Sequence, residues 1–96
     1  MSDRPVMLMV TAATRDEAEN LGEALLTAGL AKRGSVIPGI HSFQMLDGRL
    51  DRSHEAMLLV TTSTAQVAEA TAYIRAHHSF EEPQIITLQL AAEASG

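Results

Sequence analysis

The dipeptide Asp47-Gly48 is the feature that most restricts how this chain can fold. Asp-Gly favours a two-residue β-turn, because both residues tolerate the positive φ angles that such a turn requires. Strand-like segments flank the dipeptide, from about residue 33 to 46 and from Arg52 to Thr62. The sequence therefore predicts a β-hairpin whose register places His41 directly opposite His54.

The first strand of this hairpin contains an interruption. In the stretch VIPGIHSF (36–43), four good strand formers surround Pro38-Gly39. Proline removes a ladder donor and glycine weakens a strand, so the pair is foreign to the middle of a regular strand. We expect a bend or a β-bulge at this point. Beyond it, the segment with His41 and Phe43 is expected to run out along the hairpin toward a neighbouring subunit.

Two helices are predicted, one on each side of the hairpin. Thr14 and Glu17 form a capping box, and apolar residues then recur at helical spacing until Gly29, which predicts a helix over about 15–29. Ser63 with Gln66 resembles a second helix start, and His77 and His78 come at the end of that helical pattern, before Pro83.

Further strands are predicted at both ends of the chain, where Pro5–Val10 is a continuous apolar run and QIITLQL (84–90) alternates in part. The order is β-α-β-β-α-β, which predicts one α+β domain over residues 1–96. Its fold is the ferredoxin-like sandwich, a four-stranded antiparallel sheet with two helices on one face. The run AMLLV (56–60) predicts a strand buried on both faces, and therefore an assembly that covers the second face.

Composition excludes several classes of function. The formal charge is −5 and the seven basic residues are scattered, which argues against nucleic acid as a partner. The chain contains no cysteine, so disulfides, zinc-thiolate sites and thiol catalysis are excluded. The apolar run at the start is too short for a signal peptide, and no run is long enough to span a membrane, so we expect a cytoplasmic protein. No nucleophile has an evident base, so we expect no enzyme. Aromatic residues make up only 3%, and the resulting thin aliphatic core favours oligomerisation.

Histidines are the best candidates for chemistry. If His41 faces His54, the two imidazoles can share copper, nickel or zinc; the alternative is that both are exposed strand residues. His77 and His78 form a second candidate pair, with Glu81 and Glu82 nearby. The alternative for this pair is a contact with the free carbonyls at the helix C-terminus. The methionines in the predicted strands fit core packing better than copper binding; they are Met7, Met9, Met45 and Met57.

Three stretches together resemble the CutA (divalent-cation tolerance) family over nearly the whole chain. They are VTAATRDEAENLGEALLTAGLA, GSVIPGIHSFQMLDGRLDRSHEAMLLVTT and RAHHSFEEPQIITLQL. The most specific elements are the IPGI segment that leads to DGRL and the HHSFEEPQI stretch, which is similar to a histidine-histidine signature of the family.

The resemblance implies a homotrimer of ferredoxin-like subunits, similar in architecture to PII signalling proteins, with tolerance to copper and other divalent cations as its function. It implies metal binding by His77 and His78 together with a cysteine that ends the first strand. This chain departs from that pattern, since Val10 and Arg33 replace family cysteines, Leu46 replaces a tryptophan and Gln84 replaces a glutamate.

Two other functions stay open from the sequence. A PII-like regulatory module would bind a small anionic metabolite in clefts between subunits, and its cations would be Lys32, Arg33 and Arg49. A purely structural trimer would instead present its loops to a protein partner.

Overall fold

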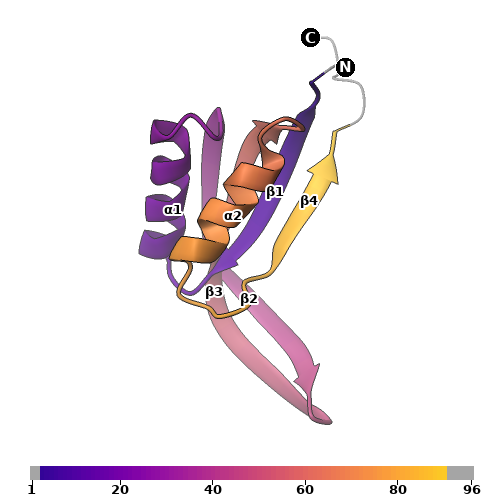
Figure 1. Ribbon diagram of the computed structural model, residues 1–96. Helices are drawn as coiled ribbons and strands as arrows, with labels where there is room; N and C mark the ends of the chain where they lie inside the picture. Colours follow the sequence, from indigo (N-terminus) through magenta and orange to yellow (C-terminus); the bar gives the residue numbers. More distant parts are fainter. Residues whose placement is uncertain (1–2, 91–96) are drawn as a thin grey trace.

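A computed structural model describes residues 3–90 of the chain. Its elements are β1 (Pro5–Ala12), α1 (Arg15–Thr27), β2 (Arg33–Leu46), β3 (Arg49–Ser63), α2 (Val67–His77) and β4 (Ile85–Gln89). The strands form one antiparallel sheet in the order β2-β3-β1-β4. Both helices lie on the same face of this sheet (Figure 1). The predicted ferredoxin-like α+β arrangement is therefore confirmed.

The core lies between the helices and the sheet and is aliphatic. Every second residue of β1 points into it, from Val6 to Ala12, and the same alternation continues in the second half of β3. These side chains pack against Leu21 and Leu25 of α1 and Ile74 of α2. No helix among residues 3–90 is long and apolar enough to cross a membrane.

The two helices begin differently. At α1 the Glu17 N–H donates to Oγ1 of Thr14 over 3.1 Å, as the capping box predicts. At α2 the prediction of a cap at Ser63 is wrong, because β3 continues to Ser63, which pairs with Pro5 of β1. Gln66 is the N-cap and forms no side-chain cap hydrogen bond. At this position, pairing of Ser63 in the sheet therefore prevents it from capping α2.

The β2–β3 hairpin has the predicted turn, register and interruption. Asp47 and Gly48 have φ angles of 51° and 77°. His41 pairs with His54. Between the pairs Ile37–Met57 and Ile40–Glu55, two residues of β2, Pro38 and Gly39, lie opposite the single residue Ala56. This is the β-bulge predicted from the sequence.

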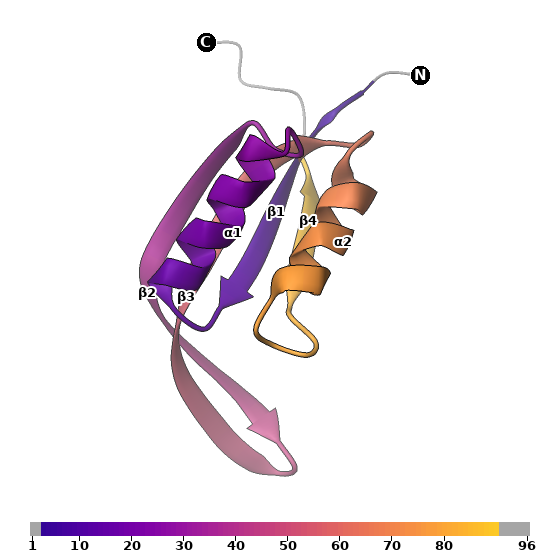
Figure 2. The same cartoon turned by 60° about the vertical axis from the view of Figure 1, so that its left-hand side comes forward.

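Beyond the bulge, the hairpin leaves the rest of the sheet. β1 pairs with β3 only from Ala56 to Ser63, so among residues 3–90 the segment 40–55 pairs only with itself. We call residues 40–55 the arm and the rest of the described chain the body. Figures 1 and 2 show the arm as a twisted two-stranded ribbon that extends past the end of both helices.

The sheet face away from the helices is apolar and has no covering layer among residues 3–90. We call it the open face, and its large apolar side chains are Met7, Met9, Ile37, Met57, Leu59, Ile86 and Leu88. The strand 56–60 is therefore buried on the helix side and only half-buried on the other. Met7, Met9 and Met57 lie on the open face and Met45 lies on the exposed arm, so the prediction that they fill the core is wrong within one subunit.

Candidate functional site

His78 lies where the end of β1, the start of α1 and the end of α2 meet. Its side chain has no exposed surface. The backbone N–H of Phe80 donates to Nδ1 over 2.9 Å, so Nδ1 carries no proton. Nε2 lies 2.7 Å from the carbonyl oxygen of Thr11 and donates to it. The imidazole is therefore neutral, in a tautomer fixed by the backbone, with both nitrogens occupied.

Glu17 connects the same loops through its carboxylate. Oε1 accepts from the N–H of Ala13 and from the hydroxyl of Ser79, each over 2.9 Å. Oε2 accepts from the Ser79 N–H over 2.6 Å. Burial raises the pKa of the Glu17 carboxyl, but the hydrogen bonds from Ala13 and Ser79 outweigh it and hold the pKa below its ordinary value. Oε2 lies 3.8 Å from Nδ1 of His78. Because His78 is neutral, this contact is not an ion pair.

His77 is exposed and behaves as the helix-end alternative predicts. Its Nδ1 lies 2.9 Å from the carbonyl oxygen of Tyr73, one turn back, and its ring stacks on Tyr73 with centroids 4.1 Å apart. Nε2 forms no hydrogen bond among residues 3–90. The two predicted metal ligands are thus adjacent in sequence but differ, because only His77 has a ring nitrogen without a partner in the described part of the chain.

Within residues 3–90, no third ligand joins this pair. Glu81 and Glu82 are exposed. No group of three or more histidine, aspartate or glutamate side chains in the described part of the chain is placed to hold a metal ion. Val10, at the position where the family resemblance implies a cysteine, is completely buried against the helices. Gln84 directly precedes β4, and its backbone carbonyl accepts from the Thr11 N–H over 3.4 Å.

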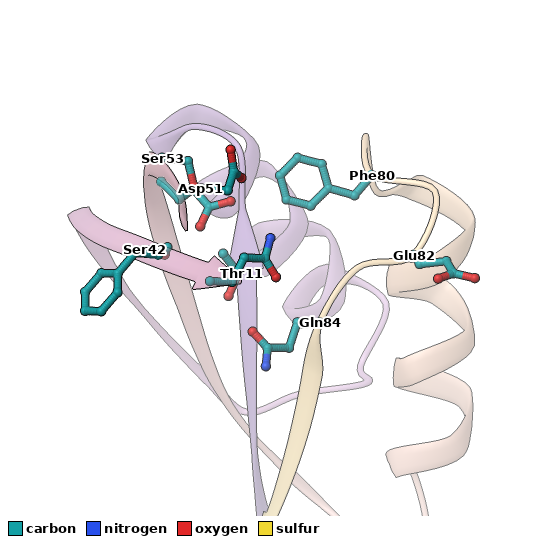
Figure 3. A pocket seen from close by; sticks show the side chains of 10 residues that line it. Thr11, Ser42, Asp51, Ser53, Phe80, Glu82 and Gln84 are labelled. Atoms are coloured by element: carbon teal, nitrogen blue, oxygen red, sulfur yellow. The ribbon is translucent and has the colours of Figure 1, made fainter. Parts of the chain in front are cut away.

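A pocket of about 490 Å³ lies between the arm and the body. In Figure 3, Asp51 and Ser53 line it from the arm, and Phe80 and Gln84 line it from the body. Three carboxylates, those of Asp51, Glu55 and Glu82, are among its lining residues, and no Lys or Arg of the described chain is. This pocket was not predicted from the sequence, although the sequence indicates a polar surface at this position. One face of the hairpin carries only polar residues at positions 42, 44, 51, 53 and 55.

The three predicted anion-binding cations do not meet within one subunit. Arg33 pairs with Thr61 at one end of the β2–β3 ladder, whereas Arg49 pairs with Leu46 at the other end. Lys32 precedes β2, and its N–H donates to the carbonyl of Thr61 over 2.8 Å.

The arm brings the other histidine pair together as predicted. The rings of His41 and His54 are stacked, with centroids 5.0 Å apart and planes inclined by 11°. Both residues are exposed. They lie on the face of the hairpin that also carries Phe43, whose ring is 6.0 Å from that of His41.

Comparisons with known proteins agree with one another. The family model described as CutA1 divalent ion tolerance protein matches residues 6–95. The divalent-cation tolerance protein CutA of Yersinia pestis (strain Pestoides F) is 28% identical over 83 residues, which cover 86% of this chain and 70% of that protein.

Two solved structures illustrate the likeness in fold. The Cut A1 divalent cation tolerance protein of Thermus thermophilus superposes with a TM-score of 0.88 at 25% identity, covering 93% of this chain and 86% of that one. CutA1 of Ehrlichia chaffeensis superposes with a TM-score of 0.91 at 22% identity, covering 99% and 89%. The second likeness concerns the fold alone.

Proposed function

The chain belongs to the CutA1 divalent ion tolerance family, and on this premise we propose that it acts in divalent-cation tolerance as a non-enzymatic homotrimer that binds a divalent metal ion, copper foremost. The observation that carries the proposal is the open face. Relatives such as the Yersinia pestis protein are named for divalent-cation tolerance, and the trimer is what the family resemblance implies.

The open face and the arm expose more apolar surface than a single subunit can cover. Ile37, Ile86 and Leu88 on the open face are 43%, 39% and 42% exposed. On the arm, Phe43, Met45 and Leu50 are 65%, 66% and 52% exposed. Large contiguous apolar patches are rare on monomeric soluble proteins and usually mark interaction sites. Association of copies through the open face would bury it, and this supports assembly.

The family-implied metal site rests on His77. Its Nε2 has no hydrogen-bond partner among the described residues, and the hydrogen bond from Nδ1 to Tyr73 fixes the tautomer in which Nε2 can bind a metal. His78 can contribute only by giving up the bond from the Phe80 N–H to Nδ1. We therefore propose that His77 is the ligand and that His78 positions the loop that follows it. A single imidazole with water ligands binds weakly.

The proposal is tested first by mass. Light scattering on the full chain should report three times 10.3 kDa. Leu59→Glu places a charge in the open face and should lower the mass toward one subunit, with the circular-dichroism spectrum retained. Ala68→Glu, on the exposed side of α2, is the matched control and should leave the mass unchanged. A monomeric wild-type chain would overturn the proposal.

The regulatory alternative is less favoured by the site. The pocket between arm and body is lined by carboxylates, which repel an anionic metabolite. Lys32 and Arg33 lie at the opposite end of β2 from Arg49, so an anion site would need cations from a neighbouring subunit.

A further inference from the structure

The arm holds a pair of histidines whose placement differs from that of His77 and His78. The two-residue turn at Asp47-Gly48 closes on the pair Leu46–Arg49. In an antiparallel hairpin the pairs alternate from there between hydrogen-bonded and non-hydrogen-bonded types. His41–His54 is five pairs further, which makes it a non-hydrogen-bonded pair. Side chains of such pairs are the closer ones, with Cα atoms typically about 4.5 Å apart.

Both rings are free to turn toward a shared ligand. They are stacked with centroids 5.0 Å apart, and both residues are exposed. None of the four ring nitrogens forms a hydrogen bond to another of the residues 3–90. His78, by contrast, has both nitrogens bonded to the backbone. Rotation about the two side-chain torsions therefore costs no hydrogen bond at His41 or His54.

We propose that His41 and His54 together bind one divalent transition-metal ion, as a two-imidazole site on the arm. Neutral imidazole suits Cu²⁺, Ni²⁺ and Zn²⁺, and affinity for nitrogen ligands is highest for Cu²⁺. Two protein ligands from facing strands leave the other coordination positions to water. This inference deepens the metal-binding part of the proposed function and assigns it to residues that the family pattern does not use.

One neighbour works against the site and thereby gives a sharp test. Arg52 pairs with Phe43, and both side chains lie on the same face of the hairpin as His54. The guanidinium carbon of Arg52 lies 5.8 Å from the centroid of the Phe43 ring. Its positive charge raises the free energy of a cation bound nearby. Replacing Arg52 by glutamine should therefore tighten metal binding, by about two- to fivefold at low salt.

The experiment is a calorimetric titration of the untagged full chain with Cu²⁺ and with Ni²⁺ at neutral pH. We expect one ion per chain on the arm, beside the weaker ion proposed at His77, with Cu²⁺ bound more tightly than Ni²⁺. His41→Gln and His54→Gln should each weaken binding at least about tenfold, since loss even of an outer-shell partner costs this much. The double variant should bind more weakly than either single one, because it leaves no imidazole at the site. His77→Gln should remove only the weaker ion proposed at His77 and leave the ion on the arm in place. Glu69→Gln, exposed on α2, is the control variant and should change neither.

Nuclear magnetic resonance of the imidazole protons provides a readout that needs no substitution. Substoichiometric Cu²⁺ should broaden the signals of His41 and His54 first and leave those of His78 sharp. The inference is overturned if His77→Gln alone removes binding, in which case the metal site of the proposed function stands. It is also overturned if no ion binds at millimolar concentration. If the wild-type chain is a monomer but the arm histidines bind, the proposed assembly fails and this inference stands.

Discussion

The body and the arm share two strands and yet have opposite surroundings. In the body half of β3, Leu58 and Val60 are each only 1% exposed. In the arm half of the same strand, Leu50 is 52% exposed. The backbone ladder is continuous across both halves except at the bulge of Pro38-Gly39. What differs is the helical layer, which covers the body and ends before the arm (Figure 2). A strand-like composition therefore indicates backbone pairing, whereas burial depends on what packs above it.

The histidines show the same division. In the body, His78 is a structural residue, because its two nitrogens satisfy the carbonyl of Thr11 and the N–H of Phe80 at a buried junction. In the arm, His41 and His54 satisfy no backbone group of the described chain. An identical side chain thus holds the fold together in one region and is available to a ligand in the other.

The largest contrast between the regions should be in stability. Leu8 of β1 is completely buried, and Leu8→Ala should lower the free energy of unfolding by about 2–5 kcal/mol, because it removes apolar contacts and leaves a cavity. Leu50→Ala in the arm should cost less than about 1 kcal/mol, since half of the side chain is already in water. Urea unfolding at one fixed protein concentration measures both, because assembly adds to apparent stability. Equal losses would mean that the arm is as well covered as the body.

A smaller effect is expected at the junction that joins the loops of the body. Glu17→Gln replaces an acceptor oxygen by a donor amide, which faces the N–H of Ala13 or of Ser79, and should cost about 1–3 kcal/mol. Glu19→Gln is the control on the same helix. Within the described chain Glu19 forms only an exposed contact of 3.8 Å with Arg15, so its loss should cost less than about 0.5 kcal/mol.

The same variant should change the acid sensitivity. The pKa of Glu17 is lower in the folded chain than its ordinary value, so the unfolded chain takes up the proton first as the pH falls. The stability from this group is complete above the ordinary pKa and is lost as the pH falls through the lowered one. Glu17→Gln should therefore reduce the slope of the free energy of unfolding against pH in this acid range. Part of the pH dependence should remain, because hydrogen bonds from the Ala65 N–H and the Thr64 hydroxyl lower the pKa of Asp3 too. An unchanged slope would rule out this account of Glu17.

The smallest effect is expected at two glycines of the hairpin. Gly48 has a φ of 77°, so Gly48→Ala should cost about 1–2 kcal/mol by placing a Cβ in the left-handed region. Gly39 lies in the bulge, has no positive φ, and has open space where a Cβ would lie. Gly39→Ala should therefore change the free energy of unfolding by less than about 0.5 kcal/mol in urea unfolding. A larger loss at Gly39 than at Gly48 would mean that the bulge, and not the turn, sets the register.

Much of the fold could be predicted from the sequence because the deciding interactions are local. The Asp47-Gly48 turn sets which residues face each other for the length of the arm. The pairing of His41 with His54 could therefore be predicted by counting residues outward from the turn. The cap at Thr14 acts over three residues, and Pro38-Gly39 breaks the ladder through its own backbone chemistry. The helix cap predicted at Ser63 is wrong because the deciding interaction there is not local: Ser63 pairs with Pro5 of β1, which is far away in the sequence.

The use of each site residue was decided by contacts between residues far apart in the chain. Glu17 meets Ser79 across 62 residues, and His78 meets Thr11 across 67. The family resemblance implied that His77 and His78 bind a metal, but only the fold determined that His78 has both nitrogens engaged. The run AMLLV (56–60) indicated that the second face of the sheet is apolar, but only the fold determined that no layer of the described chain covers it. The sequence by itself determined backbone pairing and register, which are local, while tertiary packing decided which side chains remain free to bind.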